Sequence, residues 1–314
     1  MLAEQVRSGV TETVHHGAVA VFDTNGELIA QAGEIDQPFY FRSAAKPFQA
    51  AVSQACGAGL APTELALACA SHDGEAAHLE VVEGMLAGVG LSEADLRCPP
   101  DWPLRPAAMR RVVADGAAGP RRIFHNCSGK HAAMLRASQN SGWPLPTYPQ
   151  PDHPLQKAML EFMVEVAEVD RIVGVDGCGV PVYLTSTRGM ARAFARLAHD
   201  QGLASIYTVM HTYPGLVSGE ANPDAAIARH CPAVAKRGAM GSLGVAVGGR
   251  FGVAVKCWDG SERVAGMAAI AALDALGVTP LEAAGALEPF RHPVVKGGGE
   301  PVGAYRSRLE LTWS

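Results

Sequence analysis

Lysine is scarce in this chain of 314 residues, and several other features are missing. Six lysines stand against 20 arginines among its 26 basic residues. The formal net charge is −5 and no basic stripe stands out, so the electrostatic footprint of a nucleic-acid-binding protein is absent. No apolar run reaches the roughly 18 residues that a membrane-spanning helix needs. These absences argue against nucleic-acid and membrane partners.

The chain also lacks two marks of exported proteins. Residues 1–7 do not have the basic-then-apolar layout of a signal peptide. The seven cysteines are odd in number and widely scattered, which argues against a framework of disulfides. Both observations predict a cytoplasmic protein with most of its cysteines buried as small hydrophobic residues.

The order of the predicted elements indicates an α+β fold. With 48% hydrophobic residues and a mean hydropathy of +0.09, the chain can build one large domain or two lobes that share a core. Apolar, β-branched segments form predicted hairpins at 16–32 and 243–256, and helical patterns fill the middle. We expect one antiparallel sheet from the N- and C-terminal strands, with a sheet lobe at about 1–42 and 235–314 and a helical lobe at about 43–234.

The lysines that occur in glycine-rich or apolar settings attract attention, because a lysine can shift its pKa on burial and an arginine cannot. Ser43 and Lys46 begin a predicted helix, and positions i and i+3 share a helical face. A neutral amine there can take the hydroxyl proton and activate the serine as a nucleophile. Penicillin-binding proteins and class A β-lactamases carry the same Ser-x-x-Lys spacing. A serine and a lysine three positions apart also occur often by chance.

Other reactive side chains lie beside glycine turns, and each has a purely structural interpretation as well. Ser71 precedes His72-Asp73-Gly74 at a helix exit, where a serine often serves only the turn. Lys256 ends an apolar strand and faces either the interior, where it would be desolvated or paired, or solvent. Cys127 and Cys178 are core cysteines or reactive ones; Cys127 precedes a helix start that favours a thiolate.

A metal site is an alternative use of the two cysteines. Cys127 and Lys130 are three positions apart, and Cys178 can supply a third ligand. A pair of thiolates suits zinc, although a lysine ligand has to be neutral and is unusual.

Taken together, four stretches resemble the rhizobial-type L-asparaginase II family. They are Arg42-Ser43-Ala44-Ala45-Lys46-Pro47, residues 125–131 (His-Asn-Cys-Ser-Gly-Lys-His), residues 174–179 (Gly-Val-Asp-Gly-Cys-Gly), and Lys256 ahead of Asp259-Gly260. The resemblance runs in order along nearly the whole chain. It implies a fold related to the serine β-lactamases, a homodimer, and hydrolysis of L-asparagine to L-aspartate and ammonia.

The resemblance also implies roles for individual residues. Two Ser–Lys pairs are expected in the active site, Ser43 with Lys46 and Ser71 with Lys256. Ser43 is the expected nucleophile and the second pair the expected proton relay, with the two lysines lowering each other's pKa by repulsion. The family's zinc site corresponds to Cys127, Lys130 and Cys178, and we expect the metal to position groups rather than to activate water. The expected substrate-binding residues are Arg42, Asp176, Lys130 and His131.

Two other functions remain open at this point. A β-lactamase or DD-peptidase-like hydrolase needs a Lys-Thr-Gly segment on a strand, whereas Lys256 is followed by Cys257-Trp258. A non-catalytic, zinc-dependent binding protein on the same scaffold has no need of a second Ser–Lys pair.

Overall fold

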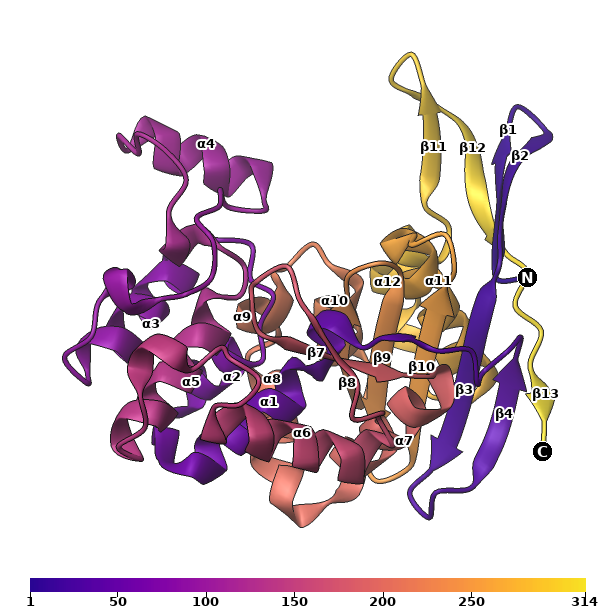
Figure 1. Ribbon diagram of the computed structural model, residues 1–314. Helices are drawn as coiled ribbons and strands as arrows, with labels where there is room; N and C mark the ends of the chain where they lie inside the picture. Colours follow the sequence, from indigo (N-terminus) through magenta and orange to yellow (C-terminus); the bar gives the residue numbers. More distant parts are fainter.

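The largest sheet is antiparallel, has six strands and joins the two ends of the chain. The computed structural model describes residues 1–314 (Figure 1). The strand order is β13 (Thr312–Trp313), β4 (Leu28–Ala32), β3 (Gly17–Asp23), β10 (Phe251–Cys257), β9 (Ser242–Val247) and β8 (Ala233–Gly238). Both predicted hairpins are present, and Val21 of one pairs with Val253 of the other. The expected sheet of N- and C-terminal strands is therefore confirmed.

The central strand β3 is buried on both faces, which explains its continuous apolar run. Successive side chains of a strand point to opposite faces. Ala20 and Phe22 accordingly enter the core shared with the helical lobe, while Val19 and Val21 enter a second core. Helix α7 (Thr187–His199) lies against the first face and helix α11 (Glu262–Ala275) against the second.

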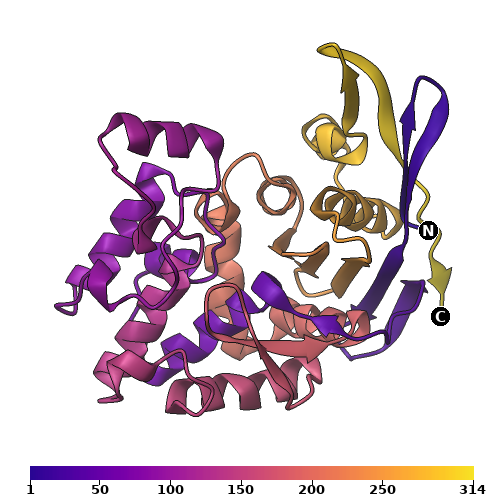
Figure 2. The same cartoon turned by 45° about the horizontal axis from the view of Figure 1, so that its top comes forward.

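A second, four-stranded antiparallel sheet was not predicted. Its order is β11 (Val294–Gly297), β12 (Glu300–Ser307), β1 (Ala3–Arg7) and β2 (Val10–His15). It extends beyond the main sheet on the side of the molecule that carries both termini (Figures 1 and 2). Strand β2 is almost entirely exposed, so no apolar run marks it. After β12 ends at Ser307, the short edge strand β13 begins at Thr312 and pairs with β4 of the main sheet.

Helices fill the middle of the chain, as expected, and lie away from the termini (Figure 1). They are α1 (Lys46–Ser53), α2 (Pro62–Ala68), α3 (Ala76–Ala87), α4 (Pro106–Ala114), α5 (Ser128–Asn140), α6 (Pro154–Ala167), α7, α8 (Ala204–Thr212), α9 (Pro214–Ser218) and α10 (Pro223–His230). Helix α12 (Ala284–Arg291) follows α11 beside the second core. A small sheet of β5 (Phe39–Tyr40), β7 (Pro181–Thr185) and β6 (Val173–Val175) lies within the mid-chain region. None of these helices is long and apolar enough to cross a membrane.

Ser43 lies where the main sheet meets the helical lobe. It belongs to a 3-10 turn, Arg42–Ala45, that leads directly into α1. This turn contacts the edge strand β8 closely at Gly238. A Cβ on Gly238 would lie 2.4 Å from Ser242 Oγ and 3.0 Å from the Phe41 carbonyl oxygen. The absence of a side chain therefore lets the end of β8 approach the turn that carries Ser43.

Candidate active site

The hydroxyl of Ser71 lies between two buried lysines. Lys46 Nζ is 2.9 Å from Ser71 Oγ, and Lys236 Nζ is 3.0 Å from the same oxygen. Both lysine side chains have a relative exposure of 0%. The three groups come from different elements, since Lys46 begins α1, Ser71 follows α2 and Lys236 lies on β8. A serine bridging two buried amines is an arrangement suited to proton transfer.

The hydrogen bonds of the two lysines differ in number. Lys46 Nζ also donates to the Ala70 carbonyl at 2.6 Å and to the Asn126 carbonyl at 3.4 Å. Three acceptors match the three N–H donors of an ammonium. Lys236 Nζ has only the Arg237 carbonyl, at 2.9 Å, besides Ser71, which suits a neutral amine with a free lone pair. Burial lowers the pKa of both lysines, and that of Lys236 to about 7.

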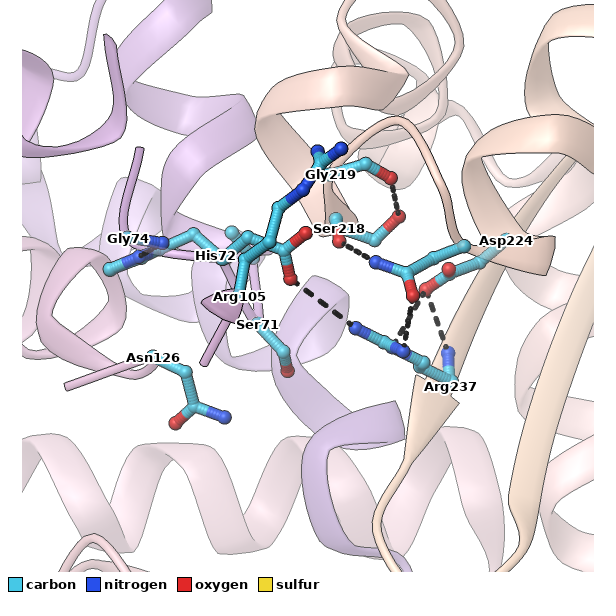
Figure 3. A network of polar contacts seen from close by, with 12 residues as sticks. Ser71, His72, Gly74, Arg105, Asn126, Ser218, Gly219, Asp224 and Arg237 are labelled. Carbon is cyan, nitrogen blue, oxygen red and sulfur yellow. Dashed lines mark hydrogen bonds and ion pairs between the residues drawn. The ribbon is translucent and has the colours of Figure 1, made fainter. Parts of the chain in front are cut away.

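Ser43 and Ser71 line the same cavity, which has a volume of about 440 Å³. Figure 3 shows Ser71, Asn126, Arg105 and Arg237 around it. Ser43 is only partly buried, and its hydroxyl is not committed to a hydrogen bond with Lys46, whose amine contacts Ser71 instead. The other lining residues are Asp73, Leu104, Pro106, Ala221, Asn222, Gly238, Ala239 and Glu262. The walls are mostly polar and carry charges of both signs.

Arg42, next to Ser43, has a strained backbone and a paired side chain. Its φ is 53°, in the left-handed region that a residue with a Cβ seldom adopts. Such a conformation costs about 1–3 kcal/mol and often occurs at functional sites. Its Nε donates to Asp176 Oδ1 at 2.7 Å. The structure thus brings the expected substrate-binding residues Arg42 and Asp176 together, but neither lines the cavity.

The three expected zinc ligands lie together, close to Lys46. Lys130 Nζ is 3.1 Å from Cys178 Sγ, and Cys127 Sγ donates to Asn126 Oδ1 at 3.2 Å. The neighbouring Cys127 and Lys130 lower the pKa of the Cys178 thiol. Burial opposes a charge on Lys130, but the neighbouring sulfurs outweigh it and raise the pKa of its amine. All three residues are buried. The lowered pKa of Cys178 and the raised pKa of Lys130 favour a charged contact between these two side chains.

His131, expected at the substrate, is fully buried beside this cluster. Its Nδ1 is 2.6 Å from the Tyr148 hydroxyl. Its Nε2 is near Cys178 but has no partner at hydrogen-bond distance. Two thiols, an amine and an orphaned imidazole nitrogen form a donor set that suits zinc. The residues present therefore fit the metal that the family resemblance implies.

His15, Cys257 and Asp259 form a second group of residues of the types that bind metals, but their side chains contact one another. His15 Nδ1 is 2.5 Å from Asp259 Oδ2, and Cys257 Sγ donates to Asp259 Oδ1 at 3.0 Å. Because the three side chains bond to one another, no ion is needed to explain their proximity.

The expected pairing of Ser71 with Lys256 is wrong. Lys256 Nζ donates to the carbonyl oxygens of Met240 and Cys257. It also lies 5.6 Å and 5.7 Å from the ring centroids of Phe39 and Trp258, within cation–π range. The amine that contacts Ser71 belongs to Lys236. The physical reason is the strand order, because β8, not β10, is the edge strand that faces the helical lobe.

A sequence signal for Lys236 exists. Lys236-Arg237-Gly238 has the Lys-x-Gly spacing of the strand motif Lys-Thr-Gly, but with arginine in the middle. It occupies the last three residues of β8. The Lys-Thr-Gly motif was compared only with the residues that follow Lys256, so the segment at 236–238 was missed.

Comparisons with known proteins agree with the resemblance. The profile of the family "L-asparaginase II" matches residues 3–307, so the chain belongs to the L-asparaginase II family. No curated protein matches the chain.

Solved structures with a partial likeness are distant. One described as "Crystal Structure Analysis of Mglu in its native form" has 15% identity and a TM-score of 0.46, over 84% of this chain and 66% of that one. "Crystal Structure Analysis of Mglu in its tris and glutamate form" has 17% identity and a TM-score of 0.40, over 89% and 64%. The chain thus spans just under two thirds of their length. Likenesses this distant do not bear on fold or function.

Proposed function

We propose that this member of the L-asparaginase II family is an amidohydrolase that hydrolyses L-asparagine to L-aspartate and ammonia through a serine nucleophile. The observation that carries the proposal is the position of Ser71 between Lys46 and Lys236, at a cavity that Ser43 also lines. Amide hydrolysis through an acyl-enzyme requires a hydroxyl nucleophile, a base and a route for the proton to the leaving nitrogen. This group of residues supplies all three.

Ser43 is the proposed nucleophile and Lys236 the proposed base. Ser43 is the more exposed of the two serines, and its hydroxyl is free to meet a substrate carbonyl. As Ser43 Oγ attacks, its proton passes to Ser71, and the Ser71 proton passes to the neutral amine of Lys236. Lys46, with three acceptors, acts as an ammonium that holds Ser71 in place and offsets developing negative charge.

The same route returns the proton. Collapse of the tetrahedral intermediate breaks the C–N bond of the side-chain amide, and the protonated Lys236 gives its proton back through Ser71 to the leaving nitrogen, which departs as ammonia. The aspartyl ester on Ser43 is then attacked by water, which loses its proton along the same path. Water adds to the acyl carbon, Ser43 regains its proton, and L-aspartate is released.

Zinc, as implied by the family, would be held by Cys127, Lys130 and Cys178, with His131 next to them. When bound there, it would supply a fixed positive charge in a buried site. The carbonyl of Asn126, the residue before Cys127, accepts from Lys46 Nζ at 3.4 Å, so the cluster is connected through Asn126 to the lysine that holds Ser71. This supports the positioning role that the sequence suggested.

A hydrolase acting on β-lactams is the second candidate. Ser43-x-x-Lys46 at a helix start and Lys236-x-Gly238 on an edge strand support a fold related to the serine β-lactamases and keep this function in view. Ammonia release from L-asparagine and L-glutamine, compared with hydrolysis of a chromogenic β-lactam, tests the proposal. We expect turnover of L-asparagine and none of the β-lactam; the reverse result would move the assignment to the second candidate.

A further inference from the structure

Arg237 has unused hydrogen-bond donors at the wall of the cavity. Its Nη1 donates to Asn222 Oδ1 at 2.7 Å. Three carboxylates surround the guanidinium at 3.9–4.0 Å, those of Asp73, Asp224 and Glu262, which is beyond hydrogen-bond distance. A guanidinium has five N–H donors in a fork that matches a carboxylate. Arg237 is therefore held in place by its neighbours but keeps donors for an anion.

Asp73 is a carboxylate in the same cavity whose oxygens accept no hydrogen bond from the protein. Its side chain is only 9% exposed, and it lines the cavity. Arg237 Nη2, at 3.9 Å, is its nearest cation, and no side-chain or backbone donor lies at hydrogen-bond distance from its carboxylate. Burial raises the pKa of this carboxyl group. A carboxylate that faces the cavity and has no hydrogen-bond donor from the protein is available to a bound cation.

The chain makes room for the Asp73 side chain at Gly219. This glycine has a φ of +82°, and a Cβ there would lie 2.1 Å from Asp73 Oδ2. Figure 3 shows Gly219 near the segment between His72 and Gly74, with Arg237 reaching toward the same segment. The backbone therefore positions Asp73 and Arg237 side by side.

The residues first expected to recognise the substrate do not offer the same chemistry. Arg42 and Asp176 form an ion pair with each other at 2.7 Å and lie outside the cavity lining. Breaking that pair to bind a substrate would leave a partly buried charge unpaired. Arg237 and Asp73 are close enough to attract each other yet too far apart to share a hydrogen bond.

We propose that Arg237 binds the α-carboxylate and Asp73 the α-ammonium of the substrate, so that the cavity selects amides of free α-amino acids. This inference rests on the proposed function. It adds that the protein recognises the α-carboxylate and the α-ammonium of the substrate. The two charged groups of an α-amino acid are attached to one carbon, which matches two protein groups 3.9 Å apart. The side-chain amide then extends toward Ser43 and Ser71 in the same cavity.

Truncated substrates test each contact separately. β-Alaninamide is L-asparagine without its α-carboxylate, and succinamate is L-asparagine without its α-ammonium. We expect Arg237→Met to lower kcat/KM for L-asparagine by about 10- to 100-fold and to leave kcat/KM for β-alaninamide at the wild-type value. We expect Asp73→Asn likewise to lower kcat/KM for L-asparagine by about 10- to 100-fold and to leave kcat/KM for succinamate at the wild-type value. Arg237→Lys, which keeps the charge, should recover part of the loss.

Arg105→Met and Glu262→Gln are the matched controls, because both side chains belong to the same wall. Arg105 already donates to Glu75 at 2.7 Å, so we expect its removal to affect L-asparagine and β-alaninamide alike. Circular dichroism and Tm confirm that each variant is folded. An equal loss on full and truncated substrates in Arg237→Met, or no loss on L-asparagine, would overturn the inference while leaving the proposed hydrolysis intact.

Calorimetric binding of L-aspartate separates this inference from the proposed function. If the wild type releases no ammonia but binds L-aspartate, and Arg237→Met loses that binding, the recognition site stands and the reaction is wrong. If the wild type neither turns over L-asparagine nor binds L-aspartate, the recognition site is wrong as well.

Discussion

Lys236 Nζ lies 3.0 Å from Ser71 Oγ, although the two residues are 165 positions apart in the chain. Lys236 is on the edge strand of the main sheet, and Ser71 follows a helix of the other lobe. The candidate site therefore exists only when the sheet and the helical lobe are assembled. The contact identifies the amine that is placed to exchange a proton with the serine hydroxyl.

The pH dependence of activity should follow Lys236. Burial lowers the pKa of this lysine to about 7, so it is an ammonium below that pH and cannot accept the Ser71 proton. We expect kcat/KM for L-asparagine to rise with pH through an inflection near 7 and then level off. Lys236→Arg keeps the charge at every pH and should lower kcat/KM by about 10²- to 10⁴-fold. A wild-type profile that is flat between pH 5 and 9 would contradict this role.

The acyl group should be found on Ser43. After rapid acid quenching of a reaction at saturating L-asparagine, peptide mass spectrometry should detect an aspartyl adduct on the peptide that contains Ser43. Ser43→Ala should form no adduct, whereas Ser71→Ala should slow its formation by about 10²- to 10⁴-fold, because the proton route is interrupted. An adduct on Ser71 would reverse the roles of the two serines.

Zinc should bind at the buried cluster. Elemental analysis of the purified wild type should find up to one zinc per chain, and Cys178→Ser should lower that content because it removes one sulfur ligand. Cys257→Ser, in the group that is satisfied by its own hydrogen bonds, is the control and should leave the zinc content unchanged. Chelated enzyme should keep activity at saturating L-asparagine with a raised KM. Complete loss of kcat on chelation would argue against a positioning role.

Gly238→Ala should separate activity from stability. The added Cβ meets Ser242 Oγ at 2.4 Å and backbone atoms of Phe41 and Ala44 at 3.0 and 3.2 Å, so β8 has to move away from the turn that carries Ser43. We expect a loss of about 1–3 kcal/mol in the free energy of unfolding. Because Lys236 moves with β8, kcat should fall even at temperatures where the variant is fully folded. Urea unfolding and ammonia release on the same samples measure the two effects.

Local sequence signals predicted the main sheet but not the partner of Lys46, whose amine contacts Ser71 and not the expected Ser43. The hairpins at 16–32 and 243–256 are long, apolar and separated by clear turns, so β3, β4, β9 and β10 were predicted from pattern alone. Strand β2 was not, since its side chains are exposed and its partner β1 pairs with β12 from the other end of the chain. Long-range pairing of this kind leaves no local pattern.

The candidate site, like the fold, was predicted from the sequence only in part. Cys127, Lys130 and Cys178 come together as the family resemblance implied. The amine of the second pair did not follow from the sequence, because both Lys236 and Lys256 lie in apolar strands and only the strand order decides which one faces Ser71. Recognition by Arg237 and Asp73 also depends on tertiary placement, since neither belongs to the stretches that carry the resemblance.

The most direct test compares Lys236→Met with Lys256→Met in ammonia release from L-asparagine. Both variants remove a buried lysine from the main sheet, so they are matched in kind, and Tm measurements show whether each is folded. Lys236→Met should lose about 10²- to 10⁴-fold in kcat/KM, while Lys256→Met should stay within about threefold of the wild type because it touches only carbonyls and aromatic rings. Full activity in Lys236→Met with loss in Lys256→Met would contradict the account.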